Sequence, residues 1–317
     1  MTIAHHIREI GRGKDGARSL GEPEALDLMS QVLDGHLTDL EIGAFAIAMR
    51  IKGESIPELS GFLSAVHARC LKVHTERPTV VLPSYNGARK LPNLTALLAL
   101  LLSQEGIDVL VHGVEEDAGR VTTASIFRDL GLPVASNANE VDDGWSRREP
   151  VFISIDALCP PLARLLAVRR VIGLRNSGHT LAKLLTPCTA RLALQVTNYT
   201  HPEYANLLHG FLGHIGANAM LLRGTEGEPV ADPRRDPKLD VYIRGVLCAD
   251  LSRPAQAGVL TALPLLPQSR DAPTTALYIQ SVVSGEKPAP PSITRQVDCI
   301  VHALGSLDHP ASTERSA

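Results

Sequence analysis

The chain has 317 residues, of which 44% are hydrophobic and 21% are charged, and its formal net charge is −3. This length allows one large domain or two smaller ones, and the composition is that of an ordinary globular protein. The net charge excludes a surface that is basic overall, so any contact with nucleic acid has to use a local patch. Only 3% of the residues are aromatic, so we expect a core built from Leu, Val, Ile and Ala.

The first 75 residues contain helical patterns only. Residues 22–33 carry apolar side chains at helical spacing, and Gly35 follows as a stop signal. Capping boxes predict two further helices, over residues 38–49 and 55–68.

From residue 79 onward, short apolar runs alternate with helical periods. Fully apolar strands that alternate with helices indicate a mostly parallel sheet covered on both faces. We expect strands at 79–82, 109–111, 151–155, 192–196 and 219–222, and helices at 94–104, 122–130 and 202–214. Residues 241–249 predict a later, more exposed strand, and helices are expected near 273–284 and 292–304.

Residues 160–187 are helical in pattern without an intervening strand, and we expect them to pack against the N-terminal helices. The predicted division is therefore a helical domain over 1–75, joined in space by the helices of about 160–187, and a large α/β domain over 76–317. The tail from Asp308 is polar, and we expect it to be frayed.

The five cysteines lie far apart in the sequence, and no pair has the spacing of a metal or redox motif. We expect reduced, mostly buried thiols. The N-terminal residues lack the basic start and apolar run of a signal peptide, and no stretch approaches the roughly 20 apolar residues of a membrane span. We therefore expect a cytoplasmic protein with no membrane partner.

Short sequence pieces along nearly the whole chain resemble one family. In the helical part they are Glu24-Ala25, Asp34-Gly35, residues 42–45, residues 49–54 and residues 58–61. They continue in order at 111–113, 169–187, 201–227 and 275–305. Through these pieces the chain resembles the anthranilate phosphoribosyltransferase family, also called glycosyltransferase family three. The resemblance implies a small all-α domain, a large α/β domain with a mostly parallel sheet flanked by helices, a cleft between them, and a homodimer formed through the helical domain.

Further pieces are more similar to one branch of this family, the YbiB branch. They are residues 10–14, 83–90, 159–161, 175–183 and 201–204. The resemblance to this branch implies sequence-independent binding of nucleic acid.

The family binds its donor, phosphoribosyl pyrophosphate, through a Gly-Thr-Gly-Gly-Asp run, because glycines let backbone N–H groups approach the pyrophosphate. The equivalent run here is Pro83-Ser84-Tyr85-Asn86-Gly87. Proline has no N–H, and Tyr85 adds bulk where close approach is needed. Only Gly87 retains the family's turn chemistry, so the sequence predicts an altered donor pocket.

The family's Mg²⁺-binding Asp-Glu pair corresponds to Pro229 and Val230, which cannot ligate a hard cation. Glu226 and Glu228 remain nearby, so a shifted metal site stays open as an alternative. We assign no catalytic residue, metal ligand or cofactor, and Mg²⁺ enters only if the chain is a transferase. The remaining positions of the altered donor pocket are Asn93, His112 and His179.

Three groups of cations are candidates for binding phosphate. Arg89 and Lys90 precede a helix, where the helix dipole favours an anion, or they are ordinary charges on a solvated turn. The segment 160–192 contains no Asp or Glu, so its cations create a local positive field unless carboxylates elsewhere pair with them. These cations are Arg169, Arg170, Arg175 and Lys183. The glycine-rich stretch near the N-terminus contributes Arg12 and Lys14. It is either a flexible basic loop that contacts a phosphate backbone or a linker that happens to be basic.

Two further side-chain types have both a functional and a structural interpretation. His112 and His179 are either acid–base groups or structural hydrogen-bonding partners. Tyr85 either stacks on a base or fills the altered pocket.

Our main hypothesis is a non-catalytic protein that binds DNA or RNA through phosphate. The alternative is a phosphoribosyl- or glycosyltransferase with an altered donor site, and a third possibility is a sensor of a small ligand.

Overall fold

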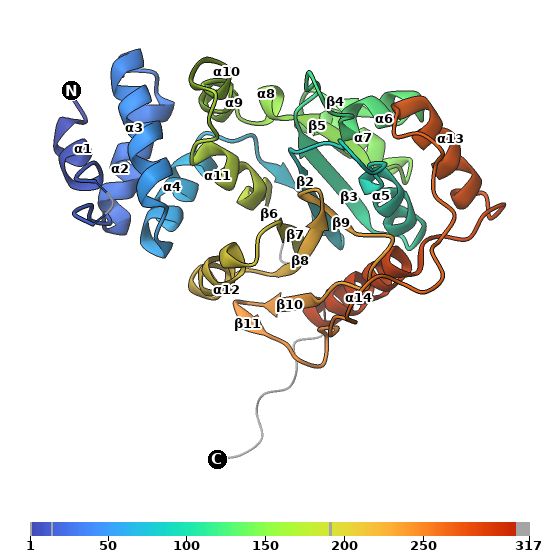
Figure 1. The fold of residues 1–317 in the computed structure, drawn as a ribbon. Helices are drawn as coiled ribbons and strands as arrows, with labels where there is room; N and C mark the ends of the chain where they lie inside the picture. The colour runs from blue at the N-terminus through green and yellow to red at the C-terminus, as the bar shows by residue number, and fades with distance from the viewer. Residues whose placement is uncertain (1, 14, 190–191, 309–317) are drawn as a thin grey trace.

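The computed structural model describes residues 2–13, 15–189 and 192–308 (Figure 1). Lys14 and the tail beyond residue 308 lie outside the described residues. Four helices form the N-terminal part: α1 (Ala4–Ile10), α2 (Glu22–Leu33), α3 (Asp39–Lys52) and α4 (Ile56–His67). Both predicted capping boxes are confirmed, because the side chains of Thr38 and Ser55 accept hydrogen bonds from the backbone N–H of Glu41 and Glu58.

The remaining chain forms a mixed sheet flanked by helices. Its strands follow the spatial order β11-β10-β8-β7-β2-β3-β5-β4, and β9 pairs with β8. The pairs from β8 through β4 are parallel, whereas β9, β10 and β11 are antiparallel additions. The sheet strands are β2 (Thr79–Ser84), β3 (Asp108–Gly113), β4 (Val134–Ala135), β5 (Val151–Ser154), β7 (Ala193–Tyr199), β8 (Ala219–Thr225), β9 (Glu228–Ala231), β10 (Leu239–Ile243) and β11 (Val246–Leu247). The two-residue strands β1 (Val73–His74) and β6 (Cys188–Thr189) pair separately.

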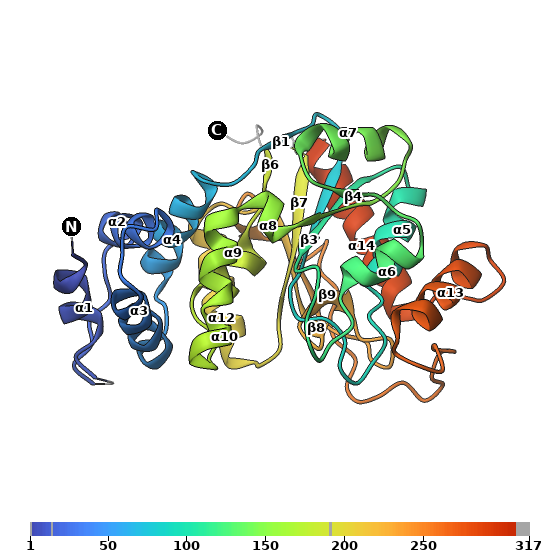
Figure 2. The ribbon, with the colours of Figure 1, turned by 90° about the horizontal axis from the view of Figure 1, so that it is seen from above.

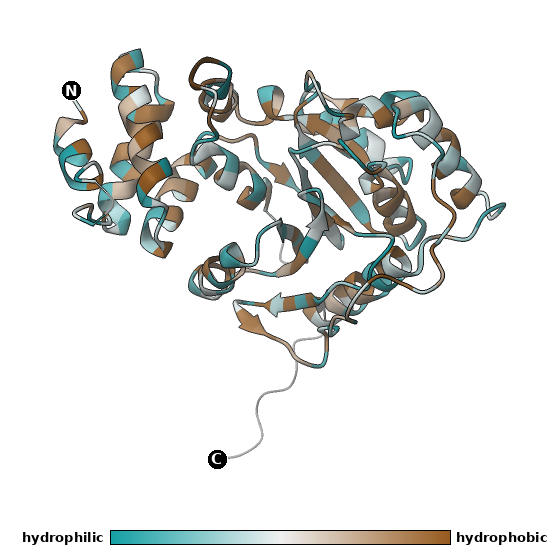
Figure 3. Cartoon of the chain, in the orientation of Figure 1, coloured by the Kyte–Doolittle hydropathy of each residue, from teal (hydrophilic) through white to brown (hydrophobic). Residues whose placement is uncertain are grey.

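Helices cover both faces of the sheet, as expected for strands that are apolar along their whole length (Figures 1 and 3). One face packs on α5 (Thr95–Gln104), α6 (Thr123–Asp129), α13 (Ala272–Val283) and α14 (Pro291–Asp308). The other face packs on α7 (Ala138–Ser146), α8 (Ile155–Leu158) and α12 (Glu203–His214). The predicted fold class, a small helical part with a mostly parallel α/β domain, is confirmed.

The segment that we expected to return to the N-terminal helices forms α9 (Pro160–Ala167), α10 (Arg169–Ile172) and α11 (Gly178–Leu184). Gly173, at φ +72, ends α10 in the left-handed region. Seen from above, α9 and α10 lie between α1–α4 and the sheet (Figure 2). The Arg164 guanidinium donates to the Leu33 carbonyl at 3.1 Å, which ties α9 to the end of α2.

The prediction of one exposed strand over 241–249 was wrong. The chain forms the hairpin β10–β11, which turns at Arg244 and Gly245, both with positive φ. β10 is buried because α14 packs against it. The sequence patterns also did not predict α7 or β9. β9 has only four residues, and α7 buries only Val141, Gly144 and Trp145, so neither contains a long apolar pattern.

No helix in the part of the chain that the structure describes has both the length and the apolar character needed to cross a membrane.

The crossing of α2 and α4 depends on Gly61. A Cβ atom there would lie 2.3 Å from the Glu22 carbonyl oxygen and 2.7 Å from the Leu26 nitrogen, both backbone atoms that cannot move alone. We predict that Gly61→Ala lowers the free energy of unfolding by about 1–3 kcal/mol, as overpacking does. The measurement is denaturant unfolding of both the variant and the parent chain.

The matched control for this substitution is Gly43→Ala in α3, where a Cβ atom would meet nothing within 4 Å. That change should leave stability unchanged or raise it by up to about 1 kcal/mol, because alanine is the better helix former. Equal effects at the two positions would contradict the packing argument.

Candidate anion-binding site

The loop that follows β2 has the geometry of a phosphate-binding loop. It leaves the sheet at Ser84, and Gly87 adopts φ +67. A Cβ atom on Gly87 would lie 2.9 Å from the Val121 carbonyl oxygen, so both the conformation and the space require glycine. The loop turns a series of backbone N–H groups toward the hairpin of β8 and β9, which carries Glu226 and Glu228.

Two carboxylates of the protein accept hydrogen bonds from these N–H groups. Glu228 is 1% exposed, and its Oε1 accepts the N–H groups of Asn86 at 2.7 Å and Gly87 at 2.6 Å. Its Oε2 accepts the Ser84 hydroxyl. Glu226 Oε2 accepts the N–H groups of Arg89 at 2.8 Å, Lys90 at 2.9 Å and Leu91 at 3.2 Å. Five backbone donors that would serve a bound phosphate are therefore satisfied internally.

The hairpin that carries both glutamates is locked onto the loop. Asn86 Nδ2 donates to the Glu226 carbonyl at 2.8 Å, and Lys183 Nζ donates to the Gly227 carbonyl at 3.0 Å. Gly227, at φ +90, lies so close that a Cβ atom would be 1.8 Å from Asn86 Nδ2. The space left between the loop and the hairpin has no room for a water molecule.

The Lys183 ammonium is therefore turned toward internal acceptors. Burial lowers the pKa of Lys183 to about 8, although the negative charge of Glu228 acts in the opposite direction. The sequence-based assignment of Lys183 to an open phosphate-binding surface does not match this placement.

Tyr85 and His112 fill the space beneath the loop. The Tyr85 hydroxyl donates to His112 Nδ1 at 2.7 Å, and His112 Nε2 donates to the Leu185 carbonyl at 3.0 Å. Burial lowers the pKa of His112 to about 3, and burial raises the pKa of Tyr85. His112 is thus neutral with both ring nitrogens engaged, and the buried Tyr85 ring is not available for stacking on a base.

The other altered donor-pocket positions make structural contacts. Pro83 lies within β2, in register with His112 of β3. Asn93 Nδ2 donates to the Thr123 hydroxyl at 2.8 Å. His179 Nδ1 lies 3.3 Å from the Asn176 carbonyl, and burial lowers the pKa of His179 to about 4.

Two arginines contact the loop, and two more lie near enough for their charges to act on Arg175. We call the four the arginine cluster: Arg50 of α3, Arg120 before α6, Arg169 of α10, and Arg175 before α11. Arg175 Nη2 donates to Asn86 Oδ1 at 2.9 Å, and Arg120 Nη1 donates to the Gly87 carbonyl at 3.4 Å. Burial lowers the pKa of Arg175, and the positive charges of Arg169, Arg120 and Arg50 lower it further, whereas the negative charge of Asp117 acts in the opposite direction.

Within residues 2–13, 15–189 and 192–308, no carboxylate lies within 4.0 Å of a guanidinium nitrogen of the arginine cluster. Sequence reasoning found Arg169 and Arg175 but missed Arg50 and Arg120. No local pattern distinguishes those two from other surface arginines.

The remaining cations chosen from the sequence do not share one environment. Arg89 and Lys90 are exposed on the loop beside Glu226, and Arg170 is exposed on α10. Arg12 forms an ion pair with Glu9 at 2.7 Å, so its charge is offset locally. The structure therefore does not bring the cations together into one surface.

Metal-ligating side chains do not converge at the loop. Pro229 and Val230 lie in the buried strand β9, and both nearby glutamates are hydrogen-bonded to backbone N–H groups. Among the described residues, the side chains spaced for a metal ion are His5, His6 and Asp27 in the helical part. There His6 Nε2 and Asp27 Oδ2 are 3.0 Å apart and form a hydrogen bond without any metal.

Comparison with known proteins places this geometry in a family. Residues 4–70 match the model of the glycosyl transferase family, helical bundle domain. The chain is 41% identical over 308 residues to the uncharacterized protein YbiB of Escherichia coli K12, covering 96% of this chain and 95% of that protein. It is 28% identical over 224 residues to an anthranilate phosphoribosyltransferase of Symbiobacterium thermophilum, covering 70% of this chain and 64% of that enzyme.

Solved structures show the same fold. The anthranilate phosphoribosyltransferase of Thermus thermophilus superimposes with a TM-score of 0.68 at 19% identity, over 95% of both chains. The enzyme of Saccharomyces cerevisiae in complex with phosphoribosyl pyrophosphate and Mg superimposes with a TM-score of 0.62 at 13% identity, over 97% of this chain and 96% of that one. The fold, the helical bundle and the 41% identity together show that this chain is a YbiB-like member of the anthranilate phosphoribosyltransferase family.

Proposed function

We propose that this protein binds nucleic acid through the phosphate backbone, without catalysis and without reading the base sequence. The arginine cluster is the observation that carries the proposal. Arg175 is partly buried, and the positive charges of Arg169, Arg120 and Arg50 act on it against the charge of Asp117. Among the described residues, none of the four forms an ion pair within 4.0 Å. Arginine is the side chain best suited to phosphate, because its planar guanidinium donates two parallel hydrogen bonds.

The arrangement of the donor loop favours a backbone ligand over a small phosphorylated one. A small ligand would need the backbone N–H groups of residues 86–91, and Glu226 and Glu228 hold most of them. The arginine cluster lies outside this closed loop and needs no enclosed pocket. A phosphate backbone satisfies such a cluster by passing over it, and such contacts carry no sequence information.

A dimer would strengthen this binding. Large apolar side chains are exposed on α3 and α10, including Leu40 at 83%, Ile51 at 60% and Val171 at 88%. Exposed apolar side chains of this size support a second copy of the chain as their cover. Two arginine clusters in one dimer would engage one long strand, which raises the affinity for longer oligonucleotides.

The first test replaces Arg120, Arg169 and Arg175 by Gln. If about four phosphates are neutralised per cluster, the parent chain should show a log–log salt slope of about −3 to −4. The triple variant should bind a long oligonucleotide about tenfold or more weakly at low salt, and its slope should be flatter by about 2 to 3. Fluorescence anisotropy over a salt series on several unrelated sequences measures both quantities.

The control for this test removes three exposed arginines that are not part of the arginine cluster. Arg128, Arg147 and Arg270 are replaced by Gln, which gives the same change in net charge near α6, α7 and α13 (Figure 1). This variant should keep the parent slope and affinity. Undetectable binding by the parent chain at low salt, or equal losses in both variants, would refute the proposal.

Phosphoribosyl transfer is the second candidate function. It is favoured by the match of the whole scaffold to proteins named anthranilate phosphoribosyltransferase, and nothing among the comparisons points to nucleic acid. The closed loop is the argument against this candidate. Pro229 and Val230 offer no carboxylate to Mg²⁺, and Glu228 repels a pyrophosphate that approaches the N–H groups of Asn86 and Gly87.

The second test titrates the protein with phosphoribosyl pyrophosphate and Mg²⁺ in a calorimeter. We expect no measurable heat of binding and no phosphoribosyl anthranilate, because the donors for the pyrophosphate are already bonded. An active anthranilate phosphoribosyltransferase serves as the positive control. Micromolar, Mg²⁺-dependent binding would make the transferase the better assignment.

A further inference from the structure

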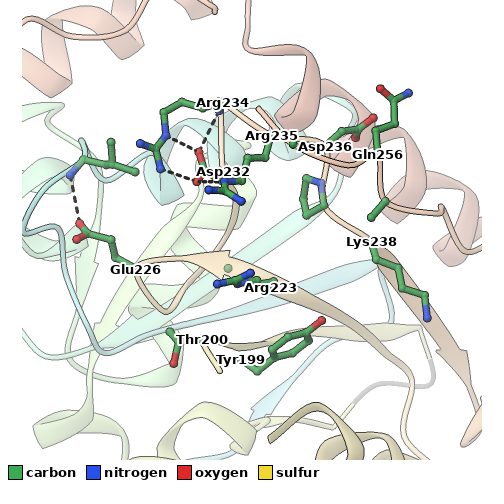
Figure 4. Close-up of a pocket in the computed structure, with 15 residues that line it drawn as sticks. Tyr199, Thr200, Arg223, Glu226, Asp232, Arg234, Arg235, Asp236, Lys238 and Gln256 are labelled. Carbon is green, nitrogen blue, oxygen red and sulfur yellow. Dashed lines mark hydrogen bonds and ion pairs between the residues drawn. The ribbon is translucent and has the colours of Figure 1, made fainter. Parts of the chain in front are cut away.

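A second cavity opens at the carboxyl ends of β7 and β8, beside the closed donor loop, with which it shares Leu91 and Glu226 (Figure 4). Its volume is about 440 Å³, and its outer wall comes from residues 232–238 and 255–258. This volume lies within the range of about 300–1,000 Å³ that is typical of small-molecule sites. In open α/β sheets, ligands bind at the carboxyl ends of the parallel strands, which is where this cavity lies.

Tyr199 and Arg223 form the floor of the cavity. They are register partners on the adjacent parallel strands β7 and β8, so their side chains lie next to each other on the same face of the sheet. Tyr199 is half-buried and Arg223 is exposed. Among the described residues, neither the Tyr199 hydroxyl nor the Arg223 guanidinium has a hydrogen-bond or ion-pair partner. An aromatic ring beside an unpaired guanidinium is therefore presented to the cavity.

Most of the carboxylates that line the cavity are already bonded. Asp232 binds the Arg234 guanidinium at 3.0 and 2.9 Å, and Glu226 is held by backbone N–H groups of the donor loop. Asp236 forms an ion pair with Arg295 through Oδ2, and its Oδ1 is buried without a hydrogen-bond partner. Lys238 is paired with Asp240, so the charges that the cavity exposes to a ligand are mainly those of Arg223 and Arg235.

Arg235 adds a second cation to the same wall. It is exposed, and its contact with Asp232 is a long one of 3.8 Å, because Asp232 is already paired with Arg234. In Figure 4, Arg235 lies above Arg223, and Tyr199 lies below it. Two guanidinium groups and a ring that line one cavity suit a ligand that has both a phosphate and a flat base.

We propose that this cavity binds a nucleotide, with the base on Tyr199 and the phosphate between Arg223 and Arg235. Base–aromatic stacking tolerates any base, so the site should not select one strongly. A free nucleoside monophosphate and the terminal nucleotide of a nucleic-acid strand share this chemistry. The proposal uses none of the arginine cluster, so it stands apart from the proposed function.

Calorimetric titration of the full chain with adenosine monophosphate, adenosine and ribose 5-phosphate tests the inference. Adenosine monophosphate should bind at least about tenfold more tightly than either fragment, because only the nucleotide engages both the ring and the guanidinium groups. A 5′-phosphorylated tetranucleotide in the same titration identifies the source of the ligand. Tighter binding of the tetranucleotide indicates a strand end, and tighter binding of the monophosphate indicates a free nucleotide.

Three variants separate the two contacts. Arg223→Gln should weaken binding of adenosine monophosphate and ribose 5-phosphate alike by about tenfold. Tyr199→Leu keeps an apolar side chain against the core and should weaken only the nucleotide, whereas Tyr199→Phe should retain its affinity. The control Arg270→Gln changes an exposed arginine outside the cavity and should have no effect.

The triple substitution in the arginine cluster should leave adenosine monophosphate binding intact, which keeps this test independent of the nucleic-acid test. The proposal is overturned if adenosine monophosphate shows no binding at millimolar concentration. It is equally overturned if ribose 5-phosphate binds as tightly as the nucleotide, or if neither Arg223→Gln nor Tyr199→Leu changes the affinity.

Discussion

The bonding of Glu226 and Glu228 to the loop after β2 is the constraint on which the cleft depends. Backbone N–H groups withdrawn from water need an acceptor, and leaving them unpaired costs more than a hydrogen bond gains. Here the acceptors are the carboxylates of Glu226 and Glu228, which belong to the protein itself. The hairpin of β8 and β9 thereby supplies an internal anion to the loop.

This closure also positions the cations of the cleft. The loop holds Arg175 through Asn86 and Arg120 through the Gly87 carbonyl. The loop thus holds the two guanidinium groups in place. Glu226 and Glu228 accept hydrogen bonds from backbone N–H groups and do not pair with these arginines. A positive surface can therefore exist on a chain whose formal net charge is −3. Binding of an anion depends on the local charge of the cleft. That charge is positive because the nearby carboxylates are already hydrogen-bonded to backbone N–H groups.

The carboxyl edge of the sheet consequently has two different halves. At β2 and β3 the edge is filled by Tyr85, His112 and the glutamate hairpin, and no water fits there. At β7 and β8 the edge stays open above Tyr199 and Arg223. The same topological position, where parallel strands end, is closed on one side and available on the other.

The sequence by itself determined the helical N-terminal part and the mostly parallel sheet. Those features depend on neighbours within a few residues, such as the capping box of Thr38 and Glu41 or the apolar run of β2. Only the tertiary structure decided that Glu228 bonds to Asn86, which lies 142 residues away, and that Arg50 and Arg120 join Arg169 and Arg175. It also decided that Arg12 is paired and Lys183 turned inward. Such contacts follow from strand order and helix packing, which bring together residues that no local pattern connects.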